Sequence, residues 1–101
     1  MTPFALLGRG RVRVIAAGVA DAERQVEREI VGAWPEARVL VRQIARLDAP
    51  ERLVGEFEVG YEIRASLAVR GDNPRRNAFR QARRKLLGTP YGGTEWSRGE
   101  G

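Results

Sequence analysis

The sequence predicts an α+β domain in which two helices pack on one face of a three-stranded sheet, in the order strand, helix, strand, strand, helix. Polar and apolar residues alternate for about fourteen residues after Gly55, which is typical of a strand with one face on a core and one in water. Two other segments repeat apolar residues every three to four positions, as amphipathic helices do. With 101 residues, of which 43% are hydrophobic, the chain has the size and composition of one globular domain.

The first strand and the first helix are expected within residues 11–33. Residues 1–10 hold a proline and two glycines and are expected to be a flexible lead-in. Residues 11–16 alternate polar and apolar and predict the first strand. Asp21 suits the N-cap of a helix whose apolar residues share one side. This helix is expected to end before Pro35, because the residue that precedes proline avoids helical backbone angles.

The second and third strands are expected to form an antiparallel hairpin. Residues 37–47 carry apolar residues at every odd position except Gln43, and three arginines at even ones. Residues 55–70 form the longest alternating segment. Pro50 lies between them and predicts a turn, since proline cannot stay in a central ladder. The first helix would join the first strand to the second through a right-handed parallel crossover.

The expected hairpin also brings charged side chains of its two strands into opposite positions. A turn near residue 52 would place Arg42 near Glu62 and Arg46 near Glu58. Such cross-strand pairs stabilise a sheet by a few tenths of a kcal/mol each. We therefore expect the outer face of the sheet to neutralise its own charge.

The last helix is expected to begin at Asn73-Pro74, with asparagine as the cap and proline in the first turn, and to end at Gly88. The domain is thus expected to span residues 11–88, followed by a flexible Gly-rich tail over 89–101. The element order is a ferredoxin-like pattern that lacks its last strand. Two aromatic residues of the tail are candidate protein-interface anchors, namely Tyr91 and Trp96.

The composition excludes several kinds of chemistry. There is no cysteine and no histidine, so the chain lacks thiolate ligands, the commonest metal ligand and the commonest general base. No Gly-rich phosphate loop and no pairing of a nucleophile with a base is present. We expect no metal, no cofactor and no enzymatic activity. No apolar run approaches the roughly 20 residues of a membrane helix, and a cytoplasmic protein is expected.

The net charge of +5 is concentrated in two segments. Residues 74–87 hold six basic groups and no acid, and residues 1–16 hold three basic groups and no acid. On the last helix Arg76, Arg80, Arg83 and Arg84 fall opposite the apolar side. The first turn, with Arg75 and Arg76, is basic although the helix dipole disfavours cations there. A bound polyanion would compensate this charge. The candidate nucleic-acid-binding residues are Arg75, Arg76, Arg80, Arg83 and Arg84 on the last helix, and Arg9, Arg11 and Arg13 at the first strand.

The sequence is compatible with two functions. The first is a small basic accessory protein that binds RNA or DNA through phosphate contacts. The element order with a basic final helix is similar in outline to small ribosome-associated factors, and its last strand, turn and helix look like the close of double-stranded-RNA-binding domains, although no motif of either family matches. The alternative is a structural subunit of a larger assembly, such as a phage particle or a multi-subunit complex. A homo-oligomer fits both.

Overall fold

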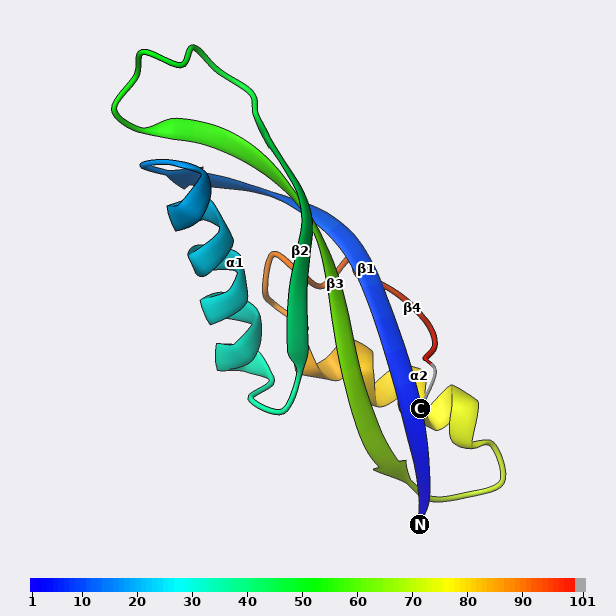
Figure 1. Ribbon diagram of the computed structural model, residues 1–101. Coiled ribbons are helices and arrows are strands. Elements are labelled where there is room, and N and C mark those ends of the chain that lie inside the picture. Colours follow the sequence, from blue (N-terminus) through cyan, green and yellow to red (C-terminus); the bar gives the residue numbers. More distant parts are fainter. Residues whose placement is uncertain (100–101) are drawn as a thin grey trace.

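The computed structural model describes residues 1–99, which form one sheet and two helices (Figure 1). The elements are β1 (Thr2–Ala16), α1 (Val19–Ala33), β2 (Arg38–Arg46), β3 (Gly55–Val69), α2 (Pro74–Lys85) and β4 (Glu95–Arg98).

The sheet has four strands in the order β2-β3-β1-β4, and every neighbouring pair is antiparallel. The expectation of three strands is therefore wrong. Because β1 and β2 both pair with β3, they run in the same direction with β3 between them. The fourth strand lies at the other edge, beside Leu6–Arg9 of β1. The arrangement is the complete ferredoxin-like order rather than a pattern that lacks its last strand.

The expected lead-in, residues 1–10, belongs to β1. The strand pairs with β3 along its whole length, from Thr2 opposite Val69 to Ala16 opposite Gly55. Gly8, one of the two glycines that suggested a loop, packs instead against the Trp96 ring. A Cβ at this position would lie 2.7 Å from the Trp96 ring and 2.7 Å from the Thr94 methyl group. Glycine is needed in the strand for this close approach and does not interrupt it.

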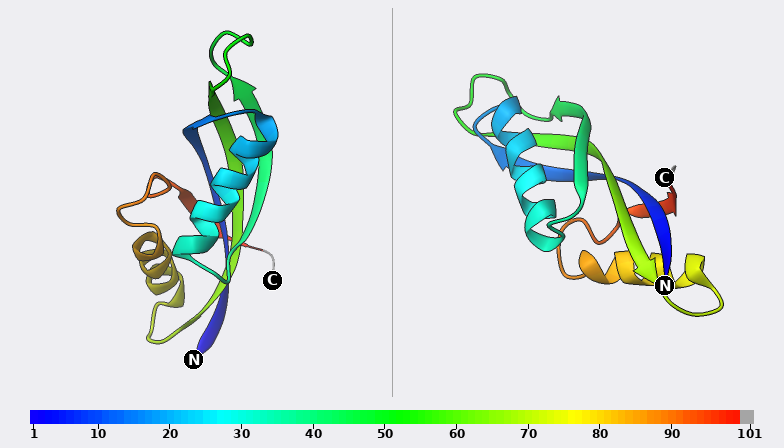
Figure 2. Two further views of the ribbon diagram at one scale, coloured as in Figure 1. Left: turned by 90° about the vertical axis from the view of Figure 1, so that its left-hand side faces the viewer. Right: turned by 60° about the horizontal axis from the view of Figure 1, so that its bottom comes forward.

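Both helices pack on the same face of the sheet, which we call the inner face (Figure 2). Even positions of β1 and odd positions of β3 point to this face, as the pairs Val12–Val59 and Val14–Phe57 show. The opposite, outer face carries no helix. The residues that the helices bury in the core are Ala22, Val26 and Ile30 from α1, and Ala78 and Ala82 from α2.

Aromatic contacts and hydrogen bonds hold the segment after α2 on the body of the protein. The ring of Trp96 lies 5.8 Å from that of Trp34 at the end of α1, and the ring of Tyr91 lies 5.4 Å from that of Tyr61. The Tyr91 hydroxyl donates to Glu29 at 2.9 Å. Tyr91 is only 1% exposed and Trp96 is partly buried. Instead of serving as exposed anchors in a loose tail, both residues pack against the core.

A β-bulge changes the register that the sequence predicts for the hairpin. Leu40 lies opposite Glu62, and the register shifts between Val41 and Gln43. The expected pair of Arg42 with Glu62 is confirmed at 3.1 Å, because the bulged arginine reaches across. The expected pair of Arg46 with Glu58 is wrong. Beyond the bulge Arg46 turns to the inner face, where it contacts the Phe57 ring and forms an ion pair of 2.9 Å with Asp48.

The close packing of Trp96 on Gly8 predicts that a larger residue at position 8 destabilises the attachment of β4. We expect Gly8→Ala to lower the free energy of unfolding by about 1–3 kcal/mol, because the added methyl group overlaps the Trp96 ring. Gly32→Ala is the matched control. It lies on α1 with nothing within 4 Å of its Cβ position, and we expect it to raise stability by up to about 1 kcal/mol through helix propensity. Urea unfolding measures both, and equal effects of the two substitutions would contradict close packing of Trp96 on Gly8.

Candidate nucleic-acid interface

Local sequence sets where α2 begins and which side it buries. The Asn73 side chain accepts a hydrogen bond of 3.1 Å from the Arg76 backbone N–H, and Pro74 occupies the first turn, which is a regular helix start. Phe79 packs edge-on against Phe4 of β1, with ring centroids 6.0 Å apart. The small buried residues of α2 lie on the same side as this contact, so the basic side of the helix points away from the sheet.

The basic side of α2 is exposed and without acidic partners. All five arginines predicted on this helix are exposed, as is Lys85. Within residues 1–99, none of these six groups forms an ion pair with a carboxylate. The structure therefore retains the charge imbalance that the sequence indicated. We call these arginines the α2 basic face: Arg75, Arg76, Arg80, Arg83 and Arg84.

Two cations of α2 contact aromatic rings. The Arg75 guanidinium lies 5.4 Å from the centre of the Phe79 ring, and the Lys85 ammonium lies 5.8 Å from the Trp34 ring. Cation–π contacts of this kind hold an exposed cation by about 0.5–1 kcal/mol and leave its charge unneutralised. The remaining arginines of the α2 basic face have no comparable contact among the described residues.

A hollow of about 350 Å³ lies beside the α2 basic face and adds a residue that the sequence analysis missed. Arg70, the residue after β3, lines it together with Arg80 and Arg84 of α2. Asn77 donates a hydrogen bond of 2.7 Å to the Arg70 carbonyl, which ties the turn to the helix. The signal that could have revealed Arg70 is its position three residues before the Asn73 cap, since a tight turn there brings the end of β3 to the start of the helix.

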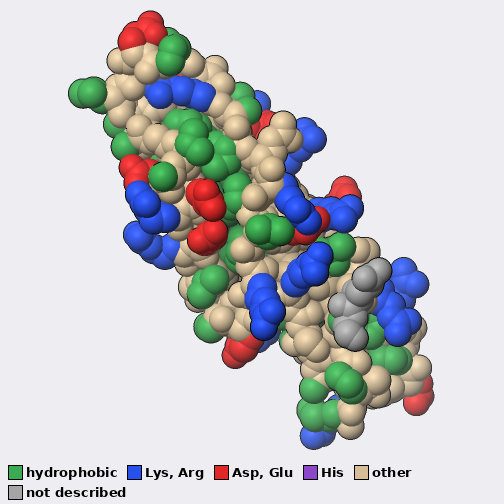
Figure 3. Space-filling model, viewed as in Figure 1, with side chains coloured by type: hydrophobic (Ala, Val, Ile, Leu, Met, Phe, Trp, Pro, Cys, Tyr) green, Lys and Arg blue, Asp and Glu red, His purple; other side chains and the backbone are tan. Residues whose placement is uncertain are grey.

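The arginines of β1 do not join this surface. Arg9, Arg11 and Arg13 lie on the outer face, opposite the helices, since they occupy odd positions of the strand. Each forms an ion pair with a glutamate of β3, at 3.2 Å to Glu62, 3.9 Å to Glu58 and 3.8 Å to Glu56, respectively. Figure 3 views this face and shows acidic and basic side chains close together along the strands. The structure thus separates the predicted residues into one unpaired set and one paired set.

Glu62 is the centre of charge pairing on the outer face. It is 6% exposed, and its two carboxylate oxygens contact Arg9 at 3.2 Å and Arg42 at 3.1 Å. The hydrogen bond from Arg42, with the nearby charges of Arg9 and Arg64, lowers the pKa of Glu62 below its usual value of 4.5, against the opposing effect of burial. Glu62 is therefore ionised at neutral pH and acts as a structural counter-ion.

Residues 1–99 contain no cluster of three or more metal-ligating side chains. In the same part of the chain, no helix has both the length and the apolar character needed to span a membrane. Comparison of the chain with protein-family models, with curated proteins and with solved structures gave no match.

The ion pairs of Glu62 make stability depend on pH in a defined direction. Because its pKa is lower in the folded state, Glu62 stabilises the fold fully above its unfolded pKa, near 4.5, and this contribution is lost as the pH falls through the folded pKa. We expect Glu62→Gln to destabilise the protein at neutral pH, and the deficit relative to the wild type to shrink in acid. Urea unfolding across a pH series measures this.

The control for this measurement is Glu51→Gln, at an exposed position of the β2–β3 loop that forms no ion pair within residues 1–99. It should be near neutral at every pH. A Glu62→Gln deficit that stayed constant down to the lowest pH at which the protein remains folded would exclude the charge pairing as its cause.

Proposed function

We propose that this protein is a non-catalytic nucleic-acid-binding factor that contacts phosphates through the α2 basic face. The observation that supports the proposal is the contrast between two arginine sets of the same chain. On β1, Arg9, Arg11 and Arg13 each have a glutamate partner. On α2, five exposed arginines have none among residues 1–99.

The position of these charges within the helix favours an anionic ligand. Arg75 and Arg76 lie in the first turn, which contains no acidic residue. Cations there oppose the helix dipole, and the arrangement is unfavourable until an anion approaches. A phosphate near this end would interact with both guanidiniums and with the amides of the first turn. A row of arginines along one exposed helix side suits a backbone that repeats phosphates.

The outer sheet face supports nucleic-acid binding less well. Recognition of single strands on sheets uses exposed aromatic residues for base stacking, whereas the aromatic residues of β3, Phe57 and Tyr61, are buried on the inner face. We therefore infer contacts to the sugar–phosphate backbone with little reading of base sequence.

A second candidate function, a subunit of a protein assembly, is favoured by a different surface. The end of the β2–β3 hairpin extends past α1 (Figure 1) and exposes apolar side chains. Leu53 is 91% exposed, and Leu47 and Val54 are 44% and 53% exposed. Ile15, which lies opposite Glu56 near the end of β1, is 69% exposed. Grouped exposed apolar residues mark contact surfaces more often than single ones do. We call these four residues the apolar tip.

For the nucleic-acid proposal, we expect the wild type to bind duplex RNA and DNA oligonucleotides with an affinity that falls steeply with salt, by about 0.9 logarithmic units per logarithmic unit of salt for each DNA phosphate contacted. The triple variant R80Q/R83Q/R84Q should reduce the magnitude of this slope by the equivalent of up to about three phosphate contacts. Fluorescence anisotropy at several salt concentrations measures both quantities.

The matched control removes three arginines that are ion-paired and lie away from α2, in the variant R11Q/R13Q/R24Q. It changes the net charge equally and should keep most of the salt slope. Binding that is insensitive to salt, or equal losses in the two triple variants, would rule out the α2 basic face as the interface.

For the assembly candidate, we expect Leu53→Asp to convert an oligomer to a monomer without loss of stability, because Leu53 is almost fully exposed in the single chain. Sedimentation velocity over a range of concentrations measures the oligomeric state, and Glu51→Gln in the same loop is the control. A wild type that stays monomeric at the highest concentration would count against self-assembly through the apolar tip.

A further inference from the structure

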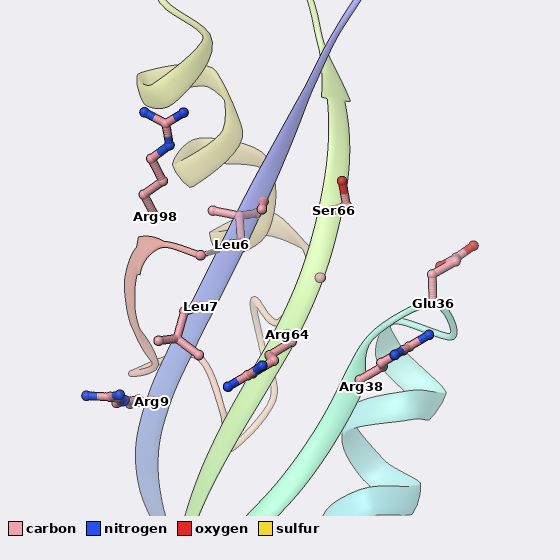
Figure 4. Close-up of a pocket in the computed structure, with 11 residues that line it drawn as sticks. Leu6, Leu7, Arg9, Glu36, Arg38, Arg64, Ser66 and Arg98 are labelled. Carbon is pink, nitrogen blue, oxygen red and sulfur yellow. The ribbon is translucent and has the colours of Figure 1, made fainter. Parts of the chain in front are cut away.

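The outer face contains a second hollow, distinct from the one beside α2, with a volume of about 750 Å³. Its floor is formed by the outer-face residues of β1 and β3 around Ala5, Leu7 and Ser66. One wall is the start of β2, with Arg38, and the other is the end of β4, with Arg98 (Figure 4). The hollow exists because β2 pairs with β3 only as far as Arg64, so the last part of β3 has no neighbour on that side.

Two arginines lie directly opposite each other across the strands in this hollow. Arg38 of β2 pairs in register with Arg64 of β3. Like charges in directly opposite positions destabilise a sheet. In Figure 4 the two side chains diverge, Arg64 towards Leu7 on β1 and Arg38 towards Glu36. The arrangement violates a local rule of sheet pairing, and such violations are typical of binding sites.

The carboxylates nearby do not neutralise this pair. Both oxygens of Glu62 are engaged, one by Arg9 and the other by Arg42. Glu36 lines the hollow but forms no ion pair with either arginine among the described residues. The fourth arginine of the lining, Arg98, has its guanidinium over the Phe4 ring at 5.6 Å, on the inner side of the sheet. The unbalanced charge of the hollow is therefore that of Arg38 and Arg64.

The size and lining of the hollow indicate the kind of ligand. Its volume of about 750 Å³ lies within the range of small-molecule sites, roughly 300–1,000 Å³. The Ser66 hydroxyl and two guanidiniums provide donors, while Ala5 and Leu7 provide apolar contact. A dianionic phosphate matches two guanidinium charges and can accept paired hydrogen bonds from each.

We propose that the Arg38–Arg64 hollow binds the phosphate group of a small phosphorylated ligand, of the size of a mononucleotide. The phosphate lies between the two guanidiniums and draws them together, and the less polar part of the ligand covers Leu7 and Ala5. This site lies on the opposite face of the sheet from the α2 basic face and does not depend on nucleic-acid binding there.

The test is titration of the full chain with pyrophosphate and with adenosine 5′-monophosphate at low salt, followed by calorimetry and by backbone amide NMR shifts. We expect saturable binding with shifts centred on Leu7, Arg64 and Ser66. The variant R38Q/R64Q should bind at least about tenfold more weakly. Its thermal midpoint without ligand should equal or exceed that of the wild type, because the substitution removes a like-charge pair.

The matched control is R80Q/R84Q, which removes the same charge from α2 and should leave the ligand-induced amide shifts of Leu7, Arg64 and Ser66 as they are in the wild type. Equal weakening in the two double variants, or shifts confined to α2, would show general attraction to positive charge and overturn the proposal. The third probe is an oligonucleotide that has phosphodiester links but no terminal phosphate group. If it shifted the amides of the hollow while adenosine 5′-monophosphate did not, the small-ligand assignment would be wrong. Failure of nucleic-acid binding at α2 would leave these results unchanged.

Discussion

The fold depends on one long antiparallel pairing, that of β1 with β3. The two strands are in register from Thr2–Val69 to Ala16–Gly55, and this register decides which side chains meet on each face. On the inner face it brings valines and Phe57 under the helices. On the outer face it brings the arginines of β1 beside the glutamates of β3. Because strand side chains alternate between faces, a slip by one residue would bury the charges and expose the core.

The parts of the fold that follow from local sequence were predictable. The end of α1 follows from Pro35 and its buried side from the apolar spacing, but its start was wrong, because the N-cap is Gly18 and not the expected Asp21. The start of α2 follows from the Asn73 cap and Pro74. The alternating pattern of β3 predicts the strand correctly because one face of the strand is exposed to water and the other is packed against the core. These elements carry their own signals, so no knowledge of their partners is needed to find them.

The parts that were missed depend on contacts between residues far apart in sequence. In the sequence, Gly8 suggests a loop. The need for glycine at this position of the strand becomes clear only from the Trp96 ring that packs on it. β4 is four residues long and pairs with the start of β1, so it has no periodicity to detect. Similarly, the bulge at Arg42 shifts the hairpin register, and without that register the opposition of Arg38 and Arg64 is invisible in the sequence.

The candidate sites show the same division. The charge imbalance of α2 could be read from the chain because one helix contains all of its members, and no acid lies among them. The basic residues of β1 looked similar in sequence, yet β3 supplies a carboxylate to each one. The net charge of a basic strand therefore cannot be judged until its neighbouring strands are known, because they can supply carboxylates. A helix side that faces water keeps the charge that its sequence shows.

The contact between Trp34 and Trp96 has a practical consequence for studying this molecule. The chain contains two tryptophans, and they lie against each other, one at the end of α1 and the other on β4. The intrinsic emission of the protein therefore originates where the last strand closes the sheet. Without any added dye, its intensity and wavelength follow the attachment of β4 to the rest of the domain, separately from the melting of the distant hairpin.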